Sequence, residues 1–278
     1  MRVQSLHIYP VKGARVVNLE RARVVMRGLA GDRRWLVTDD KGAFLSQRNY
    51  PALAQIGAAL TQGGLRLVHG ADSFAVARPD GARRAVTVWN DVVDAADAGD
   101  EAANWLSRAL GRSARLCYMD EQAARTTSGR WGPQGPVSFA DSHPVLITTR
   151  ASLAALNDAV VANGGAPAAM ARFRPGIVID GTYPWAEDCW KRIRIGALEF
   201  ALEKPCGRCI VTTLDPETGE KTGVEPLRTL QKMRRSAHPD LVGGALFGWN
   251  AAPCAEGDIA VGDRVEVFEE RPEGWPLA

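Results

Sequence analysis

The sequence predicts a β-rich α+β protein built from two successive parts. Residues 2–96 contain short apolar runs separated by turn residues, a pattern typical of a compact β-barrel or sandwich. Helical patterns occur in only a few segments, all in the region after residue 99. Strand-like runs continue after residue 140, so the second part is expected to mix strands with helices.

The first part is predicted to be a set of strands joined by tight turns. Gly63-Gly64, Gly70-Ala71-Asp72 and Pro79-Asp80-Gly81 mark the turns, because these residue types adopt the backbone conformations that hairpins require. The expected strands contain the runs Val24-Val25, Trp35-Leu36-Val37, Leu65-Arg66-Leu67-Val68, Phe74-Ala75-Val76 and Val86-Thr87-Val88-Trp89.

A helix is expected next, at about residues 100–110. Ala103, Leu106 and Leu110 fall on one face of it, and acidic residues stand at its start. Gly111 follows directly and is suited to end a helix. We therefore predict a first domain over residues 1–120, a β-barrel-like unit with one helix.

Residues 123–135 predict a linker or mobile loop, because they are rich in glycine, serine, threonine and proline. Trp131 and the two arginines of this segment line a substrate entrance in one interpretation. In the other, the segment is a solvated loop with a single anchoring aromatic residue. The sequence leaves both interpretations open.

The remaining elements define a second domain over residues 121–270, followed by a tail at 271–278. They begin with a buried strand and a helix capped by a threonine. In order, we expect a strand at 144–147, a helix from Thr148-Thr149 to about Ala162 that ends before Gly164-Gly165, strands near 176–180 and 192–202, a helix from Pro226 to about Arg235, and a strand over 258–267 that closes the sheet.

The most informative motif is the pair Cys206 and Cys209, separated by Gly207-Arg208. The alternating run before it and the β-branched run Ile210-Val211-Thr212-Thr213 after it both predict strands. Arg208 adjoins Cys209 and is expected to lower the pKa of that thiol, because a nearby cation favours the thiolate. A thiolate is the form that binds a soft metal or attacks an electrophile.

Several kinds of site use such a pair. A thioredoxin-like pair needs a helix start, which the β-branched run does not favour, and a structural zinc site needs further paired ligands. Cys117, Cys189 and Cys254 are single, and the four histidines are scattered. A single thiolate ligand to a cofactor-bound metal and two inert buried thiols both remain open from the residues alone.

Composition excludes several classes of function. The chain has 278 residues, 46% of them hydrophobic and 24% charged, and a net charge of +2, which gives no strongly basic face for nucleic acid. No apolar run is long enough for a membrane span, and the first residues lack the pattern of a signal peptide. Five cysteines without a disulfide pattern fit a reducing cytoplasm. Glycine-rich nucleotide motifs are absent, so neither nicotinamide nor nucleotide triphosphate is expected.

Five blocks in order along the chain resemble the molybdenum cofactor sulfurase C-terminal (MOSC) domain family, in the branch that includes the mitochondrial amidoxime-reducing component and its bacterial relatives. The resemblance implies an N-terminal β-barrel domain and a MOSC β-barrel domain with flanking helices. The blocks are Ile8-Tyr9-Pro10-Val11-Lys12-Gly13, Gly28-Leu29-Ala30-Gly31-Asp32-Arg33-Arg34-Trp35, Arg172-Phe173-Arg174-Pro175-Gly176-Ile177-Val178, Cys206-Gly207-Arg208-Cys209-Ile210-Val211-Thr212-Thr213 and Leu246-Phe247-Gly248-Trp249-Asn250.

The resemblance implies a molybdenum cofactor, in which the pterin dithiolene supplies two sulfurs and one protein cysteine a third. Cys209 matches the family's metal ligand, and soft sulfur suits such a metal. Gly13 stands where serine is common and Gly176 where asparagine is usual, so each lacks a side-chain hydrogen bond that backbone or water could replace. The matched cofactor-binding positions are Lys12, Gly13, Arg33, Ser142, Arg174, Gly207, Arg208, Cys209 and Asn250.

The residues of these blocks also allow plainer roles. Lys12 at a strand end is ordinarily solvated, Arg33 could pair only with Asp32, and Arg174 could make a surface ion pair. Cys206 is either a packed thiol or a redox neighbour of Cys209. The three basic residues belong to matching blocks and therefore suggest one pocket that binds an anion.

The expected function is a cytoplasmic, molybdenum-dependent reductase of N-hydroxylated compounds such as amidoximes, hydroxylamines and N-hydroxylated bases. Asp141 and His143 are candidate catalytic proton carriers, although Asp141 suits a turn or helix cap equally well. No four-cysteine spacing for an iron–sulfur cluster occurs, so a separate electron donor of the ferredoxin or flavin reductase type is expected. The alternatives are a carrier of the cofactor or of sulfur, and a thiol protein without pterin.

Overall fold

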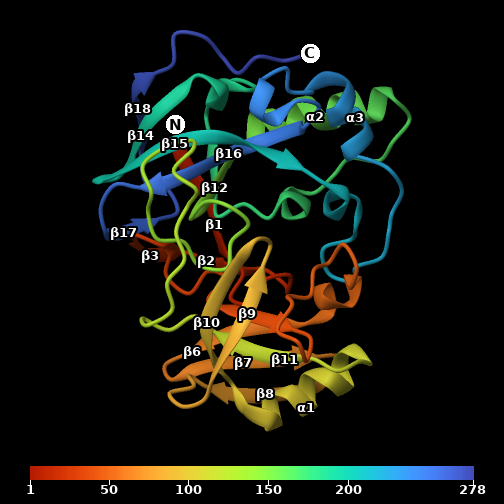
Figure 1. Cartoon of the computed structure of the whole chain (residues 1–278). Helices are drawn as coiled ribbons and strands as arrows, with labels where there is room; N and C mark the ends of the chain where they lie inside the picture. The colour runs from red at the N-terminus through yellow and green to blue at the C-terminus, as the bar shows by residue number, and fades with distance from the viewer.

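The computed structural model describes all 278 residues and contains two β-rich parts, one above the other in Figure 1. The lower part holds two of the three small sheets and helix α1 (Gly99–Leu110). The upper part holds the largest sheet, the third small sheet, helices α2 (Arg150–Ala162) and α3 (Leu227–Met233), and both chain termini. The predicted β-rich α+β fold is confirmed. None of the helices is long and apolar enough to cross a membrane.

The largest sheet has eight strands in the order β18-β14-β15-β16-β12-β13-β1-β2. Its pairs are antiparallel except for β12 and β13, which run parallel and are joined by helix α2. Apolar side chains of this sheet form a core around Trp249 and Phe200. Its strands are β1 (Arg2–Ile8), β2 (Val17–Leu19), β12 (Val145–Thr149), β13 (Ile177–Asp180), β14 (Trp190–Ile195), β15 (Leu198–Arg208), β16 (Ala245–Pro253) and β18 (Val265–Glu270).

Three smaller sheets complete the fold. Two of them, with α1, enclose a second core around Trp35 and Trp105. The first of these two sheets has the order β5 (Trp35–Thr38), β11 (Arg115–Tyr118), β10 (Asp91–Asp97), β9 (Arg83–Val88). The second has the order β6 (Gly57–Thr61), β7 (Gly64–His69), β8 (Asp72–Ala77). The third small sheet has the order β17 (Gly257–Ala260), β3 (Arg21–Val25), β4 (Gly28–Leu29).

The first strand of the chain, β1, pairs with β13 and so lies in the large sheet of the upper part. The segment 1–120 therefore supplies strands to both parts. The predicted domain boundary at residue 120 remains a prediction.

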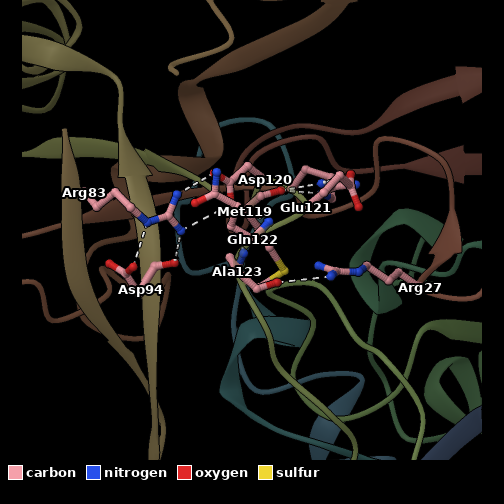
Figure 2. A network of polar contacts seen from close by, with 9 residues as sticks. Arg27, Arg83, Asp94, Met119, Asp120, Glu121, Gln122 and Ala123 are labelled. Atoms are coloured by element: carbon pink, nitrogen blue, oxygen red, sulfur yellow. Dashed lines mark hydrogen bonds and ion pairs between the residues drawn. The ribbon is translucent and has the colours of Figure 1, made fainter. Parts of the chain in front are cut away.

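Three arginines hold residues 119–123, and Figure 2 labels two of them, Arg27 and Arg83. Arg83 donates to both carboxylates Asp94 and Asp120, and the Nη2 of Arg27 donates to the carbonyl of Ala123 at 3.0 Å. Arg34 donates to the carbonyl of Met119 and to Glu121. Because these arginines lie in separate segments of the chain, their hydrogen bonds fix residues 119–123 against both parts.

Local signals set the ends of the helices as predicted. Gly111 ends α1 in the left-handed conformation with φ of +64°, and the Thr149 hydroxyl accepts a hydrogen bond from the backbone N–H of Ser152 at the start of α2. Helix α3 follows Pro226 and is two residues shorter than expected, ending at Met233.

Three expected strands are wrong. Residues 192–202 belong to two antiparallel strands, because β14 ends at Ile195 and β15 begins at Leu198 after a turn. Residues 258–267 form two strands in different sheets, because β17 pairs with β3 and β18 pairs with β14. Residues Ile210–Thr213 form a 3₁₀ turn. The hydroxyls of Thr212 and Thr213 donate to the carbonyls three residues earlier, Cys209 and Ile210, and thereby satisfy the backbone locally. The other 3₁₀ turns are Pro51–Gln55, Met170–Phe173, Ala186–Asp188 and Pro239–Leu241.

Candidate active site

A pocket between the two parts brings together every predicted site residue. Gly176, the second departure from the family pattern, lies outside it. The lower part of the chain contributes Lys12, Gly13, Arg33, Phe44, Leu45, Ser46, Gln47, Arg48 and Trp89. The rest of the lining is Ala140, Asp141, Ser142, His143, Leu146, Phe173, Arg174, Cys206, Gly207, Arg208, Cys209, Val211, Thr212 and Asn250.

Lys12 is a buried cation at one wall of the pocket. Its Nζ donates to the carbonyl of Phe139 at 2.7 Å and to Oδ1 of Asp141 at 2.5 Å. Burial lowers the pKa of Lys12, and the attraction of Asp141 offsets this only in part. Lys12 is therefore a desolvated, anchored cation and not the solvated edge residue that its sequence context allowed.

Asp141 is held as the anion. The Asp141 side chain remains 72% exposed at the pocket. Partial loss of water would raise its pKa, but the Lys12 ammonium, Arg33 and the indole N–H of Trp89 together hold the pKa well below its usual range. A carboxyl group in this state releases its proton at any ordinary pH. The geometry thus suits Asp141 to orient Lys12 and makes it a poor proton donor.

Gly13 follows Lys12 with a φ of +84°, a conformation that side chains rarely adopt. A Cβ atom there would lie 3.2 Å from Cδ1 of Leu53. Its carbonyl accepts a hydrogen bond of 2.8 Å from the side-chain amide of Gln47. Glycine therefore fits this backbone, and Gly13 can offer the pocket only main-chain groups.

Arg33 and Arg174 both stack on the ring of Tyr9, with guanidinium carbons 4.8 and 4.0 Å from its centroid. Both arginines have left-handed backbones, with φ of 50° and 53°. Arg33 pairs with Asp32, whose other oxygen accepts the backbone N–H of Tyr9 at 2.7 Å. The Tyr9 ring thus aligns two cations toward one pocket.

Arg174 keeps an unused donor. Its Nη1 donates to the carbonyl of Ala14 at 2.9 Å, whereas its buried Nη2 has no partner. Burial lowers the pKa of Arg174 to about 10, so the side chain remains charged at neutral pH. A buried cation with a free N–H is a strong site for an anion such as phosphate.

Arg208 contacts Cys206 and not, as expected, Cys209. Its Nη1 lies 2.8 Å from Sγ of Cys206, its Nη2 donates to the carbonyl of Phe173 at 2.7 Å, and its buried Nε has no partner. The expectation failed because both Cys206 and Arg208 belong to strand β15, where residues two apart point to the same side.

Cys209 follows the end of β15 and precedes the 3₁₀ turn. The backbone N–H and the hydroxyl of Thr212 both donate to its carbonyl, at 3.1 and 2.9 Å. Its half-buried sulfur therefore lines the pocket from a fixed backbone. Opposite β15, the Nδ2 of Asn250 donates to the carbonyl of Pro205 at 3.4 Å and helps to fix the strand.

His143 lies in a chain of hydrogen bonds that the sequence did not reveal. Its Nδ1 is 2.9 Å from Oγ of Ser142, and its Nε2 is 2.7 Å from Oε2 of Glu203. The side chains of His143 and Glu203 are only 3% and 5% exposed. The chain connects a buried carboxylate to a hydroxyl on the pocket wall.

Glu203 was missed because it alternates with apolar residues along β15 and resembles an ordinary solvent-facing residue. The segment around Gly132 covers it, since a Cβ atom at Gly132 would lie 2.5 Å from Oε1 of Glu203. Trp89 and Phe44 were missed because only the folded chain brings them to the pocket.

The segment 123–135 is anchored to both parts. Arg125 is buried and donates to Asp91 and to the carbonyls of Ser138 and Ala140. Trp131 lies in an aromatic cluster with His238 and Trp275. Trp131 does not line the pocket, so the anchoring role is the one that the structure supports.

Comparison with known proteins matches both parts of this chain to one family. Residues 1–113 match the model of the MOSC N-terminal beta barrel domain, and residues 134–266 match the MOSC domain. The mitochondrial amidoxime-reducing component 1 of Homo sapiens is 32% identical over 284 residues, which cover 96% of this chain and 82% of the relative. The chain belongs to the MOSC family.

Other MOSC relatives are similar at comparable levels. The mitochondrial amidoxime-reducing component 1 of Xenopus laevis is 30% identical over 95% of this chain and 81% of the relative. The molybdenum cofactor sulfurase of Danio rerio is 29% identical over 83% of this chain but only 30% of its own length. Membership thus associates the chain with the molybdenum cofactor.

The pocket of this MOSC chain fits the molybdenum cofactor. The unpartnered donors of Arg174 and Arg208 are available to an anion, and Cys209 offers the soft ligand. The structure contains no cluster of three or more histidine, cysteine, aspartate or glutamate side chains that could hold a metal ion by themselves. A metal held largely by its own organic ligand suits this donor set.

Proposed function

We propose that this protein is a molybdenum-cofactor-dependent reductase of N-hydroxylated compounds. The observation that supports it most strongly is the convergence of Cys209 with four cations, Lys12, Arg33, Arg174 and Arg208, in one pocket. A soft thiol beside buried donors without partners is matched to a metal with an anionic organic ligand.

In this proposal Cys209 binds the metal, and the cations bind the phosphate and pterin. Gly13, Gly207 and Asn250 line the same wall, while Ser142 offers a hydroxyl. When bound, the cofactor supplies the two electrons that break the N–O bond of the substrate. The protein supplies binding, orientation and protons.

Reduction of an N-hydroxyl group to the parent nitrogen compound consumes two electrons and two protons and releases water. We assign proton delivery to Ser142, His143 and Glu203, because their hydrogen bonds run from the buried carboxylate to the pocket. Glu203 orients the imidazole through the contact of 2.7 Å with its Nε2. Asp141, an ion-pair partner of Lys12, is assigned a positioning role in place of the proton transfer first expected.

Electrons come from a separate donor protein in this proposal. The test supplies them artificially: holoprotein from a host that makes molybdopterin is given a chemical reductant and benzamidoxime. Repeated turnover to benzamidine supports a reductase. Cys209→Ala should abolish it, and Cys254→Ser, which alters an exposed cysteine away from the pocket, should not.

A second candidate function is transfer of sulfur or cofactor to an acceptor protein. The contact of 2.8 Å between Arg208 and Cys206 favours it, because a cation would stabilise a persulfide anion on that sulfur. Loss of cofactor to an acceptor without turnover, together with a persulfide on Cys206 in mass spectrometry, would favour this second function over reduction.

A further inference from the structure

Trp89 occupies a backbone position that is unusual for a large side chain. Val88 of β9 pairs with Asp91 of β10, which leaves Trp89 and Asn90 as a two-residue turn. Trp89 has a φ of +56°. Glycine or asparagine is normal at such a position, and a bulky residue there destabilises the fold. Such outliers cluster at functional sites in proteins.

The indole of Trp89 is held at the pocket from two sides. Its Nε1 donates to Oδ1 of Asp141 at 3.1 Å, the same oxygen that pairs with Lys12. The ring of Phe44 lies 4.9 Å away at an angle of 69°. Trp89 nevertheless remains 38% exposed. A fixed ring therefore presents a partly open surface beside the cations of the site.

The protein itself shows which groups this surface accepts. The guanidinium carbon of Arg48 lies 4.8 Å from the centroid of the Trp89 ring. A guanidinium is a flat, delocalised carbon–nitrogen cation, close in shape to an amidine. The exposed indole thus binds the kind of group that an amidoxime becomes after reduction.

We propose that Trp89 is the platform on which the planar body of the substrate stacks. This inference rests on the proposed function and deepens it, because it names flat aromatic compounds, such as aryl amidoximes and N-hydroxylated nucleobases, as the substrate class. Trp89 and Cys209 line the same pocket, so a ring stacked on Trp89 places the N–O group in the cavity that Cys209 lines. Arg48, on a flexible side chain, leaves the ring face when a substrate stacks.

The test compares an aromatic with an aliphatic substrate in the holoprotein. Trp89→Leu should raise KM for benzamidoxime about tenfold, with kcat little changed, because it removes the stacking contact between the indole and the substrate ring. Kinetics with acetamidoxime should stay within about twofold of the wild type, because that substrate has no ring. Trp89→Phe should restore most of the affinity. Tyr183→Leu, which removes an aromatic residue 65% exposed and outside the pocket, is the matched control.

Calorimetric titration of benzamidine into the same holoproteins provides a readout without turnover. Weaker binding to Trp89→Leu by a similar factor supports the platform. Equal effects on both substrates, or unchanged benzamidine binding, would overturn it. If the wild type reduces no N-hydroxylated compound, the proposed function fails, while the titration still decides the role of Trp89. Should the Leu variant not fold, Trp89→Gly, which relieves the left-handed backbone, serves in both measurements.

Discussion

Nε2 of His143 and Oε2 of Glu203 are 2.7 Å apart, and both side chains are almost completely buried beside the pocket. A buried imidazole held by a carboxylate at one nitrogen and a hydroxyl at the other has a fixed orientation. This arrangement is typical of groups that transfer protons.

Glu203→Gln should therefore lower kcat for benzamidoxime by about 10- to 100-fold, with KM little changed. The amide still accepts a hydrogen bond and holds the ring in place, but it lacks the charge of the carboxylate that assists proton transfer. Steady-state kinetics with benzamidoxime measures both parameters. Glu199→Gln, a change on the same strand within surface ion pairs, should have no such effect; an unchanged kcat in Glu203→Gln would contradict the assignment.

Arg174→Gln should weaken retention of the pterin. The substitution removes a buried cation with an unused N–H and its stacking on Tyr9. Loss of a charged hydrogen bond of about 1.5–3 kcal/mol corresponds to at least tenfold weaker binding. Pterin released by dialysis, measured by fluorescence after oxidation, tests this. Arg150→Gln, a change in an exposed arginine paired with Asp180, should release no more than the wild type; equal retention in all three proteins would argue against a phosphate or pterin contact at Arg174.

Glu187 should make the fold less stable as pH rises. Its buried carboxylate accepts from Ser152 at 2.9 Å and Thr149 at 3.1 Å, yet burial raises its pKa to about 7. Between the ordinary pKa and this value the folded state binds more protons than the unfolded chain. The stabilisation that protonated Glu187 gives the folded state is thus complete below the ordinary pKa of a glutamate and is lost as pH rises through about 7.

Glu187→Gln should remove this pH dependence, a difference of about 3 kcal/mol across the interval. Urea unfolding at several pH values measures it. Glu220→Gln, a change in an exposed residue, should keep the slope of the wild type. Parallel stability curves for wild type and Glu187→Gln would show that Glu187 does not titrate in this range.

Trp89→Gly should be more stable than Trp89→Ala by about 1 kcal/mol. Both variants lose the contacts with Phe44 and Asp141, and they differ only in whether a Cβ atom must occupy the left-handed backbone. Thermal or urea unfolding compares them. The opposite order would mean that the turn adopts another conformation in solution.

The sequence predicted the elements whose signals are local. The apolar runs, the glycine after α1 and the threonine before α2 each act through neighbouring residues, and the structure confirms them. Residues from all five blocks that carry the resemblance line one pocket, which is the candidate site.

What the sequence could not provide depends on contacts between distant segments. Glu203 became a site residue only because the segment around Gly132 covers it, and Trp89 only because a hairpin reaches the second part. The β-branched run after Cys209 favoured a strand, but threonine hydroxyls bonded to the backbone stabilise a turn there. Arg208 pairs with the cysteine on its own side of the strand, which adjacency in sequence conceals.

Cys209 binds molybdenum in the proposed function, and Cys206 does not. X-ray absorption at the molybdenum edge distinguishes the two thiols when it is measured on holoprotein and on the Cys206→Ser and Cys209→Ser variants. We expect a cysteine sulfur in addition to the two dithiolene sulfurs in the wild type and in Cys206→Ser, and its loss in Cys209→Ser only. Loss of that sulfur in Cys206→Ser with retention in Cys209→Ser, or folded wild-type protein without molybdenum, would contradict it.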